Sequence, residues 1–251
     1  MKQLILHIPH FSPLIPFKDG YVVNNEILQN EILKLTDRFT DDLFHSESDI
    51  TIKADFSRIF CDVERFPDDK DEIMSAFGMG ALYTRTDSGE TLRNVTPDLR
   101  NKILNEYYYP HHKKLFDAVR TQLEKFSDVL IIDCHSFPNN PFERDLNKEV
   151  PRPDFNIGID SFHTPEKIKD TAPEFFKSKG YSVFIDKPYK GTIVPLEYYR
   201  KNKNVQSIML EVNRKLYMSE TTLEKSENYH NVKTILKDFF EILRNSNISS
   251  K

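Results

Sequence analysis

The sequence predicts an α/β fold in which a mixed or mostly parallel sheet is layered between helices. Short apolar runs alternate along the chain with longer amphipathic stretches, the pattern of strands and helices that share one sheet. With 251 residues, 38% of them hydrophobic, the chain has the size of one large α/β domain. It contains no internal repeat, low-complexity segment or interdomain linker, so we expect residues 1–251 to form a single domain.

Apolar runs bounded by turn residues predict the strands of this sheet, at residues 4–8, 58–63, 129–134, 155–159, 181–185 and 207–212. Capping residues and apolar periodicity predict helices from Asn24 or Asn25 to about Phe44, from Thr96 to Phe126 with a kink or break at Pro110, over residues 165–179, and from Ser219 to about Leu243. Residues 68–95 are polar and irregular, typical of a surface excursion or lid. The tail, residues 245–251, is predicted to fray.

The composition excludes several classes of function. The net charge is −4 and no basic stripe is present, which argues against a nucleic-acid partner. No apolar run is long enough for a membrane span or a signal peptide. The two cysteines, Cys61 and Cys134, lie in apolar runs and predict no disulfide framework. We therefore expect a soluble, cytoplasmic protein.

Ionisable side chains lie at the ends of several predicted strands, where an α/β sheet binds its ligands. The groups are His10, Arg58, Asp62, Glu64, Arg65, Asp133, His135 and Glu211. Two histidines and a carboxylate are the usual protein ligands of a catalytic zinc, and a further carboxylate can act as general base. Arginines nearby can hold a substrate carboxylate or stabilise an oxyanion. Walker A, G-x-G-x-x-G, G-x-S-x-G and H-E-x-x-H motifs are absent.

Each of these residues also has an ordinary structural interpretation. His135 can be a hydrogen-bonded histidine at a strand end, and Glu211 can form a salt bridge with Arg214 or Arg58. Asp133 lies two residues before His135, so in a strand it points to the same face and can orient that imidazole. His111 and His112, beside two lysines on a helix, are expected to face solvent.

Several segments, in this order, resemble the N-formylglutamate amidohydrolase family and together span roughly residues 8–218. They are Ile8-Pro9-His10-Phe11-Ser12, Ser57-Arg58-Ile59-Phe60-Cys61-Asp62-Val63-Glu64-Arg65-Phe66, Asp133-Cys134-His135-Ser136-Phe137-Pro138, Pro188-Tyr189-Lys190-Gly191 and Leu210-Glu211-Val212-Asn213-Arg214. The resemblance implies a zinc-carboxypeptidase-like (phosphorylase/hydrolase-like) architecture, similar to aspartoacylase. It also implies zinc-dependent hydrolysis of an N-acyl amino acid, typically N-formylglutamate to formate and glutamate, in histidine breakdown.

The resemblance also implies a role for each matching residue. His10 and His135 correspond to the histidine ligands of one zinc ion, and Glu211 to the general base. Arg58 corresponds to the arginine that stabilises the oxyanion. Asp37, in a further matching segment at residues 36–44, is the expected third ligand, because Pro13 occupies the position where carboxypeptidases place theirs.

The residues around Arg65 would bind substrate. Arg65 corresponds to the arginine that grips the substrate carboxylate, and Asp62 would orient a zinc histidine from behind. Glu64 stands where aspartoacylase-like relatives have asparagine, and it is, with Asp62, an alternative third ligand. Tyr189 lies in a turn-like loop that can close over substrate or be an ordinary surface turn.

The sequence therefore predicts a zinc amidohydrolase with a single catalytic domain that acts on a small N-acyl amino acid. The alternatives are a carboxypeptidase-like hydrolase of another acyl amino acid or peptide, and a binding protein that has lost turnover. The sequence does not predict the oligomeric state.

Overall fold

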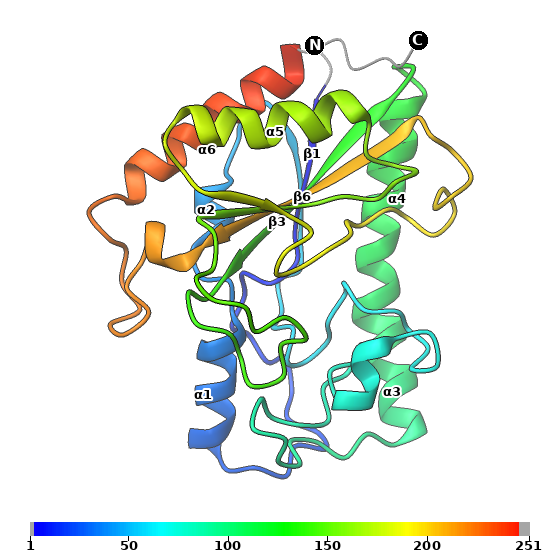
Figure 1. Ribbon diagram of the computed structural model, residues 1–251. Coiled ribbons are helices and arrows are strands. Elements are labelled where there is room, and N and C mark those ends of the chain that lie inside the picture. Colours follow the sequence, from blue (N-terminus) through cyan, green and yellow to red (C-terminus); the bar gives the residue numbers. More distant parts are fainter. Residues whose placement is uncertain (1–2, 246–251) are drawn as a thin grey trace.

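The computed structural model describes residues 3–245 and has a six-stranded sheet flanked by helices (Figure 1). The strand order is β2-β1-β3-β6-β4-β5, and neighbouring strands are parallel except for β4 and β6. The strands are β1 (Ile5–Ile8), β2 (Ile50–Lys53), β3 (Val129–Phe137), β4 (Phe155–Gly158), β5 (Val183–Ile185) and β6 (Val205–Asn213). The predicted α/β class with a mostly parallel sheet is confirmed.

Helices cover both faces of the sheet, with α5 and α6 on one face and α4 on the other (Figure 1). The helices are α1 (Asn25–Leu35), α2 (Thr40–Leu43), α3 (Pro97–Ile103), α4 (Tyr109–Leu123), α5 (Glu166–Ser178) and α6 (Tyr229–Asn245). Shorter 3₁₀ or π segments are η1 (Ile73–Phe77), η2 (Leu104–Tyr108) and η3 (Arg214–Leu216).

The alternation of side chains along the central strands decides which residues face α4. Ile5, Val129, Ile131 and Val205 pack in one apolar cluster with Leu115 and Val119 of α4. Since side chains alternate with a period of two, His7, Asp133, His135 and Glu211 lie on this same face, further along their strands. The opposite alternation sends Leu6, Ile132 and Leu210 into the core under α5 and α6. The sheet itself thus brings these polar groups together near α4.

The helix predicted to reach Phe44 instead ends at Leu35, and α2 begins at Thr40. Two hydrogen bonds mark its end: within the helix the Thr36 hydroxyl donates to the Ile32 carbonyl at 2.6 Å, and outside it the Asp37 N–H donates to the distant His10 carbonyl at 2.9 Å. Phe39 then adopts a left-handed conformation with φ 65°. Asp37 therefore lies in a break between two helices, beside the end of β1, and not within the continuous helix that the sequence predicted.

The strand predicted at residues 58–63 is wrong. This apolar stretch is a buried turn, and the structure instead places β2 at Ile50–Lys53, which the sequence analysis missed. One edge of β1 pairs with β2 and the other with β3, so β1 has no free edge for residues 58–63. Ile59, Phe60 and Cys61 are buried by packing alone.

The remaining boundaries differ by a few residues, with one exception. β3 continues to Phe137, so His135 lies within the strand, and the predicted interruption near Pro110 is the π segment η2. The last helix begins at Tyr229 and not at Ser219, because the intervening residues form turns. Of the tail predicted to fray, Asn245 ends α6, and residues 246–251 lie outside the described residues.

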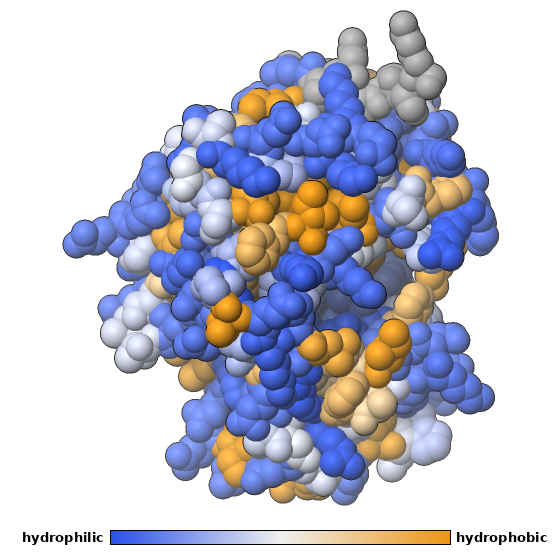
Figure 2. All heavy atoms as spheres, in the orientation of Figure 1, coloured by the Kyte–Doolittle hydropathy of each residue, from blue (hydrophilic) through white to orange (hydrophobic). Residues whose placement is uncertain are grey.

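The surface is mostly polar. On the face shown in Figure 2, hydrophilic side chains predominate and apolar ones gather in small groups between them. Among residues 3–245, no helix is long and apolar enough to cross a membrane.

Asp42 of α2 forms hydrogen bonds with the start of the C-terminal helix and the segment before it. Its carboxylate accepts hydrogen bonds from Tyr229 (2.7 Å) and Lys225 (2.8 Å) and one from Lys233. Partial burial opposes the charge, but these donors hold the pKa of Asp42 below its usual range. The bonds therefore stabilise the fold at neutral pH, and this contribution is lost as pH falls through the pKa of the carboxyl.

We expect Asp42→Asn to lower the free energy of unfolding by about 1 kcal/mol at pH 7, a value already reduced for solvent screening at this half-exposed site. The difference from wild type should begin to shrink below about pH 4, where the carboxyl becomes protonated in the unfolded chain while the folded protein still keeps it charged. Urea unfolding at several pH values checks this, with Asp41→Asn on the same helix as control. An undiminished difference at pH 3 would contradict the charge-based explanation.

Candidate active site

Three residues predicted as metal ligands come together at the carboxyl edge of the sheet. His10 follows β1, His135 is in β3, and Asp37 lies in the break between α1 and α2. One ligand atom from each lies within 4.8 Å of the others, and all three side chains are buried. Asp37 Oδ2 is 3.8 Å from His10 Nδ1 and 3.5 Å from His135 Nδ1. Both imidazoles thus turn the same nitrogen, Nδ1, towards one carboxylate oxygen.

The outer nitrogens of both imidazoles are held by carboxylates. His10 Nε2 lies 2.8 Å from Asp62 Oδ1, and His135 Nε2 lies 3.0 Å from Asp133 Oδ1. When Nε2–H of His10 donates to Asp62, Nδ1 keeps its lone pair, and this buried atom has no hydrogen-bond partner among the described residues. Burial and the nearby Arg58 lower the pKa of His10, which favours this neutral form. A buried lone pair without a donor is suited to binding a metal cation.

Asp37 is fixed by donors on both of its oxygens. Arg214 Nη2 donates to Oδ1 at 3.0 Å, and the Ser136 N–H donates to Oδ2 at 3.1 Å. Burial opposes the charge on Asp37, but His135 and Arg214 hold its pKa below the usual range. For His135 burial also opposes the charge, yet Asp133 and Asp37 raise the pKa of its imidazole well above the ordinary value. The surrounding carboxylates therefore favour a positive charge at this point.

The Asp62 carboxylate accepts hydrogen bonds from several side chains. Arg58 donates to its Oδ2 from Nε (3.2 Å) and Nη2 (3.0 Å), and the Tyr83 hydroxyl donates to the same oxygen at 2.8 Å. Although burial opposes its charge, Arg58 and His10 hold the pKa of Asp62 well below the usual range. The carboxylate thus fixes Arg58 beside His10.

Glu211 of β6 lies next to His135 of the adjacent strand β3. The residues are partners in the register of β3 and β6, so their side chains share one face of the sheet. Only 6% of Glu211 is exposed, and its Oε2 is buried without a hydrogen-bond partner among the described residues. Burial raises its pKa. The arginines suggested as salt-bridge partners are engaged elsewhere, Arg214 with Asp37 and Arg58 with Asp62.

Arg65 and Glu64 lie on the turn that carries Asp62. The Arg65 side chain is 24% exposed, and its closest carboxylate oxygens are at 3.6 Å (Asp62) and 3.8 Å (Glu72). Its buried Nε has no hydrogen-bond partner among the described residues, so this guanidinium is only loosely paired. Glu64 Oε2 lies 4.0 Å from His135 Nε2.

Tyr189 lies near Glu211 but its hydroxyl is already bonded. Its carbonyl accepts a hydrogen bond at 2.9 Å from Asn156, the β4 residue that pairs with Glu211 in register. Its hydroxyl donates to Asp145 at 3.1 Å and accepts from Arg152 at 3.3 Å. The loop is therefore tied to the site through its backbone.

The histidines expected to face solvent do not. His111 is 3% exposed, and its Nε2 lies 2.8 Å from His7 Nε2; His112 Nε2 lies 2.9 Å from the Val63 carbonyl. The lysines beside them suggested a solvated helix face. Their burial comes from tertiary contacts of α4 with β1 and with the turn at Val63, which the local sequence does not show.

Comparisons with known proteins agree with one another. Residues 2–218 match the family model described as N-formylglutamate amidohydrolase. The chain belongs to the N-formylglutamate amidohydrolase family. The resemblance noted in the sequence is thereby confirmed.

Relatives cover most of this amidohydrolase-family chain. It is 24% identical over 238 residues to an N-formylglutamate deformylase of Pseudomonas putida, covering 87% of this chain and 82% of that protein. A deformylase of the same name from Pseudomonas aeruginosa is 24% identical over 182 residues, 68% of this chain and 65% of that protein. The crystal structure of N-formylglutamate amidohydrolase from Ralstonia eutropha JMP134 is similar with a TM-score of 0.82 and 26% identity, over 96% of this chain and 94% of that one.

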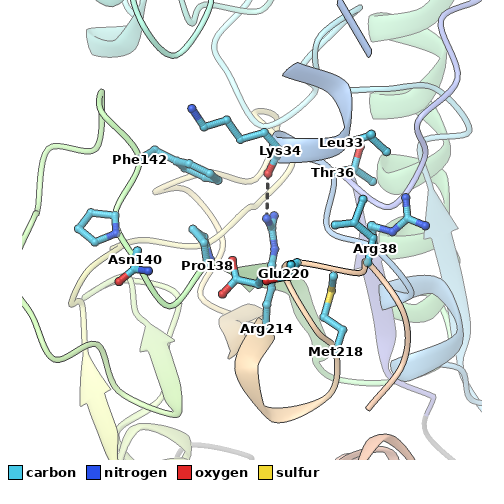
Figure 3. Close-up of a pocket in the computed structure, with 13 residues that line it drawn as sticks. Leu33, Lys34, Thr36, Arg38, Pro138, Asn140, Phe142, Arg214, Met218 and Glu220 are labelled. Atoms are coloured by element: carbon cyan, nitrogen blue, oxygen red, sulfur yellow. Dashed lines mark hydrogen bonds between the residues drawn. The ribbon is translucent and has the colours of Figure 1, made fainter. Parts of the chain in front are cut away.

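A cavity of about 410 Å³ lies behind Asp37 in this amidohydrolase-family fold (Figure 3). Arg214 lines it and points its guanidinium towards the Lys34 carbonyl, to which Nη1 donates at 2.8 Å. None of the site residues predicted from the sequence is among the described residues that line this cavity. Arg214 thus lines the cavity and also donates a hydrogen bond to Asp37.

We expect Arg214→Met to destabilise the metal-free protein by about 3–5 kcal/mol, because it leaves the Asp37 carboxylate buried without its cation. Urea unfolding of the single variants and of the double variant with Asp37→Ala checks this. The double variant should lose less than the sum of the two single losses, since both remove the same interaction. Additive losses would show that the pair is not coupled.

Proposed function

We propose that this chain is a zinc-dependent amidohydrolase that hydrolyses N-formylglutamate to formate and glutamate. The observation that supports a metal site is the buried Nδ1 of His10, which has no hydrogen-bond partner among the described residues and faces Asp37 and His135. The Nε2 atoms of both imidazoles are held by carboxylates. The substrate comes from the names of the relatives, which are N-formylglutamate deformylases.

The donor set fits one zinc ion. Catalytic zinc sites use three nitrogen or oxygen ligands from the protein and leave a position open, and ligands of a tetrahedral zinc lie roughly 3.3–3.6 Å apart. The two nitrogen–oxygen distances here are 3.5 and 3.8 Å, so small side-chain movements bring His10, Asp37 and His135 to such a geometry. When bound, zinc would lower the pKa of a water molecule and polarise the acyl carbonyl.

Glu211 is the group that we assign to proton transfer. Its free Oε2 and its place beside His135 let it take a proton from the attacking water and return it to the leaving nitrogen. Burial raises its pKa, which strengthens it as a base relative to an exposed carboxylate.

Arg58 is assigned to the oxyanion that develops on the formyl oxygen. Its Nε and Nη2 are used by Asp62 and Tyr83, and these bonds hold the guanidinium still, so that Nη1 is the nitrogen left for substrate. A donor that is already oriented stabilises the transition state without further reorganisation.

Arg65 is assigned to a carboxylate of the substrate, since its buried Nε is free and its pairing with Asp62 and Glu72 is loose. Glu64, next to Arg65 on the same turn, and Tyr189, on the loop bonded to Asn156 of β4, are also assigned to the substrate. The anion of Glu64 disfavours a second substrate carboxylate close to it, so we place only one of the two carboxylates of formylglutamate at Arg65.

The wider setting is part of the same proposal. Residues 1–251 would act as one catalytic domain, because the site draws on residues from His10 to Arg214 around a single sheet. A cytoplasmic location fits the free, buried state of Cys61 and Cys134. Histidine breakdown would supply the substrate, a small N-acyl amino acid.

We expect Glu211→Gln to lower kcat for N-formylglutamate hydrolysis by about 10²- to 10⁴-fold while the protein keeps its zinc. Formate release and metal content of the same samples check this, with Glu174→Gln on the exposed side of α5 as control.

Chelation should abolish the wild-type activity, and added zinc should restore it. Activity that survives chelation would overturn the zinc mechanism, and zinc binding without any turnover would instead indicate a binding protein.

We expect Arg65→Met to raise KM for N-formylglutamate about 10- to 100-fold, because the substrate carboxylate loses a pair of charge-assisted hydrogen bonds. Arg65→Lys should raise KM by a smaller factor. The substitution should have little effect on a formylated amine that lacks a carboxylate. Initial rates with both substrates, together with N-acetylglutamate and a dipeptide, check this. Faster wild-type turnover of the dipeptide would favour a carboxypeptidase-like hydrolase.

A further inference from the structure

A line of buried side chains runs from His135 into the interior, away from the proposed metal. Asp133 Oδ1 lies 3.0 Å from His135 Nε2 and 2.9 Å from His7 Nδ1. His7 Nε2 lies 2.8 Å from His111 Nε2. The four residues are between 0% and 5% exposed. They form a continuous hydrogen-bonded chain that the proposed reaction does not use beyond His135.

Three separate elements build this chain. His7 of β1 and Asp133 of β3 are register partners, so the parallel pairing fixes their side chains on the same face. His111 lies on α4, and its ring is 5.1 Å from that of His7 between centroids. The position of Asp133 therefore depends on β1 and α4 as well as on its own strand.

Both oxygens of Asp133 are held by donors. Oδ1 accepts from His7 and His135, and Oδ2 accepts from the Ile193 N–H at 3.2 Å. An ionised carboxylate is only an acceptor, so each imidazole must present an N–H to it. That requirement sets which nitrogen of His135 points inward, and it leaves Nδ1 towards Asp37 and His10.

His7 also lies between two carboxylates. Its Nδ1 is 3.1 Å from Glu64 Oε1 as well as 2.9 Å from Asp133 Oδ1. Without the imidazole, the Asp133 and Glu64 carboxylates would lose the N–H that both approach, and their mutual repulsion would displace Asp133.

We propose that His7, supported by His111, is a positioning residue for the metal site: it holds Asp133 in the place from which Asp133 orients His135. The inference deepens the proposed function and rests on it, because it concerns the same metal ligand. Residues that orient a ligating histidine typically change metal affinity or activity by about 10- to 100-fold when substituted. His7 is fully buried and reaches no substrate, so its effect should fall on the metal and not on KM.

The test compares His7→Leu, His7→Asn and His111→Leu with the wild-type protein. The asparagine amide can replace Nδ1–H towards Asp133 but cannot reach His111, whereas leucine removes both bonds. The dissociation constant for Zn²⁺ is measured by competition with a chromogenic chelator, and kcat and KM are measured at saturating Zn²⁺.

We expect the dissociation constant to rise about 10- to 100-fold in His7→Leu and less in His7→Asn and His111→Leu, with KM unchanged. His163→Leu is the matched control, because His163 is equally buried and has two bonds of its own, 2.7 Å to the Val205 carbonyl and 2.8 Å from the Arg200 N–H. It should lower the melting temperature without weakening Zn²⁺ binding.

Zn²⁺ affinity that stays at the wild-type value in all three variants, or that falls equally in His163→Leu, would overturn the positioning role. If His7→Leu does not fold, His7→Asn and His111→Leu decide the matter by the same comparison. A wild-type protein that binds no Zn²⁺ would instead contradict the proposed function itself, so the two failures are distinguishable.

Discussion

The hydrogen bonds from Asp62 and Asp133 to the outer nitrogens of His10 and His135 govern the arrangement of the whole site. Each fixes a ring so that Nδ1 faces Asp37, at 3.8 and 3.5 Å. Because a carboxylate accepts several hydrogen bonds, each of these anions also gathers other groups: Asp62 holds Arg58 and Tyr83, and Asp133 holds His7 and the backbone of Ile193. Arg58, which we assign to substrate, is thus oriented by Asp62, the same anion that orients the proposed metal ligand His10.

Burial of the charged side chains makes this arrangement possible, but it also costs free energy. Charged groups in an apolar interior must be paired with opposite charges or hydrogen-bond partners. Apolar clusters cover both faces of the sheet, so such pairing is confined to the ends of the strands. Parallel strands β1, β3 and β6 end together at one edge of the sheet, so the fold supplies the ligands from strands that are far apart in sequence. Asp37 and Asp62 come from outside the sheet, and each is held there by an arginine, Arg214 or Arg58.

The sequence predicted the strand-borne part of the site better than the rest. His10, His135 and Glu211 follow or interrupt apolar runs, and such polar groups are visible in a pattern of period two. Asp37 was named only through the family resemblance and was placed on a helix, because the hydrogen bond from its N–H to the His10 carbonyl is tertiary and leaves no local signal. The apolar run at residues 58–63 looked like a strand, yet β2 occupies the edge it would need, and Ile50–Lys53 is too polar to be recognised. The burial of His111 likewise depends on how α4 lies across β1.

The balance of charge in the site gives a physical reason for a cation at its centre. Carboxyl groups outnumber guanidinium groups among the residues gathered there, namely Asp37, Asp62, Glu64, Asp133 and Glu211 against Arg58, Arg65 and Arg214. Burial opposes the charge on Asp37, Asp62, Asp133 and Glu211, so other positive groups nearby stabilise the site. His7 is one of them, since Asp133 and Glu64 outweigh the effect of burial and raise its pKa to about 9. At His135, Asp133, Asp37 and Glu211 favour a positive charge, and a divalent cation bound between His135, Asp37 and His10 would satisfy these anions at the cost of displacing protons.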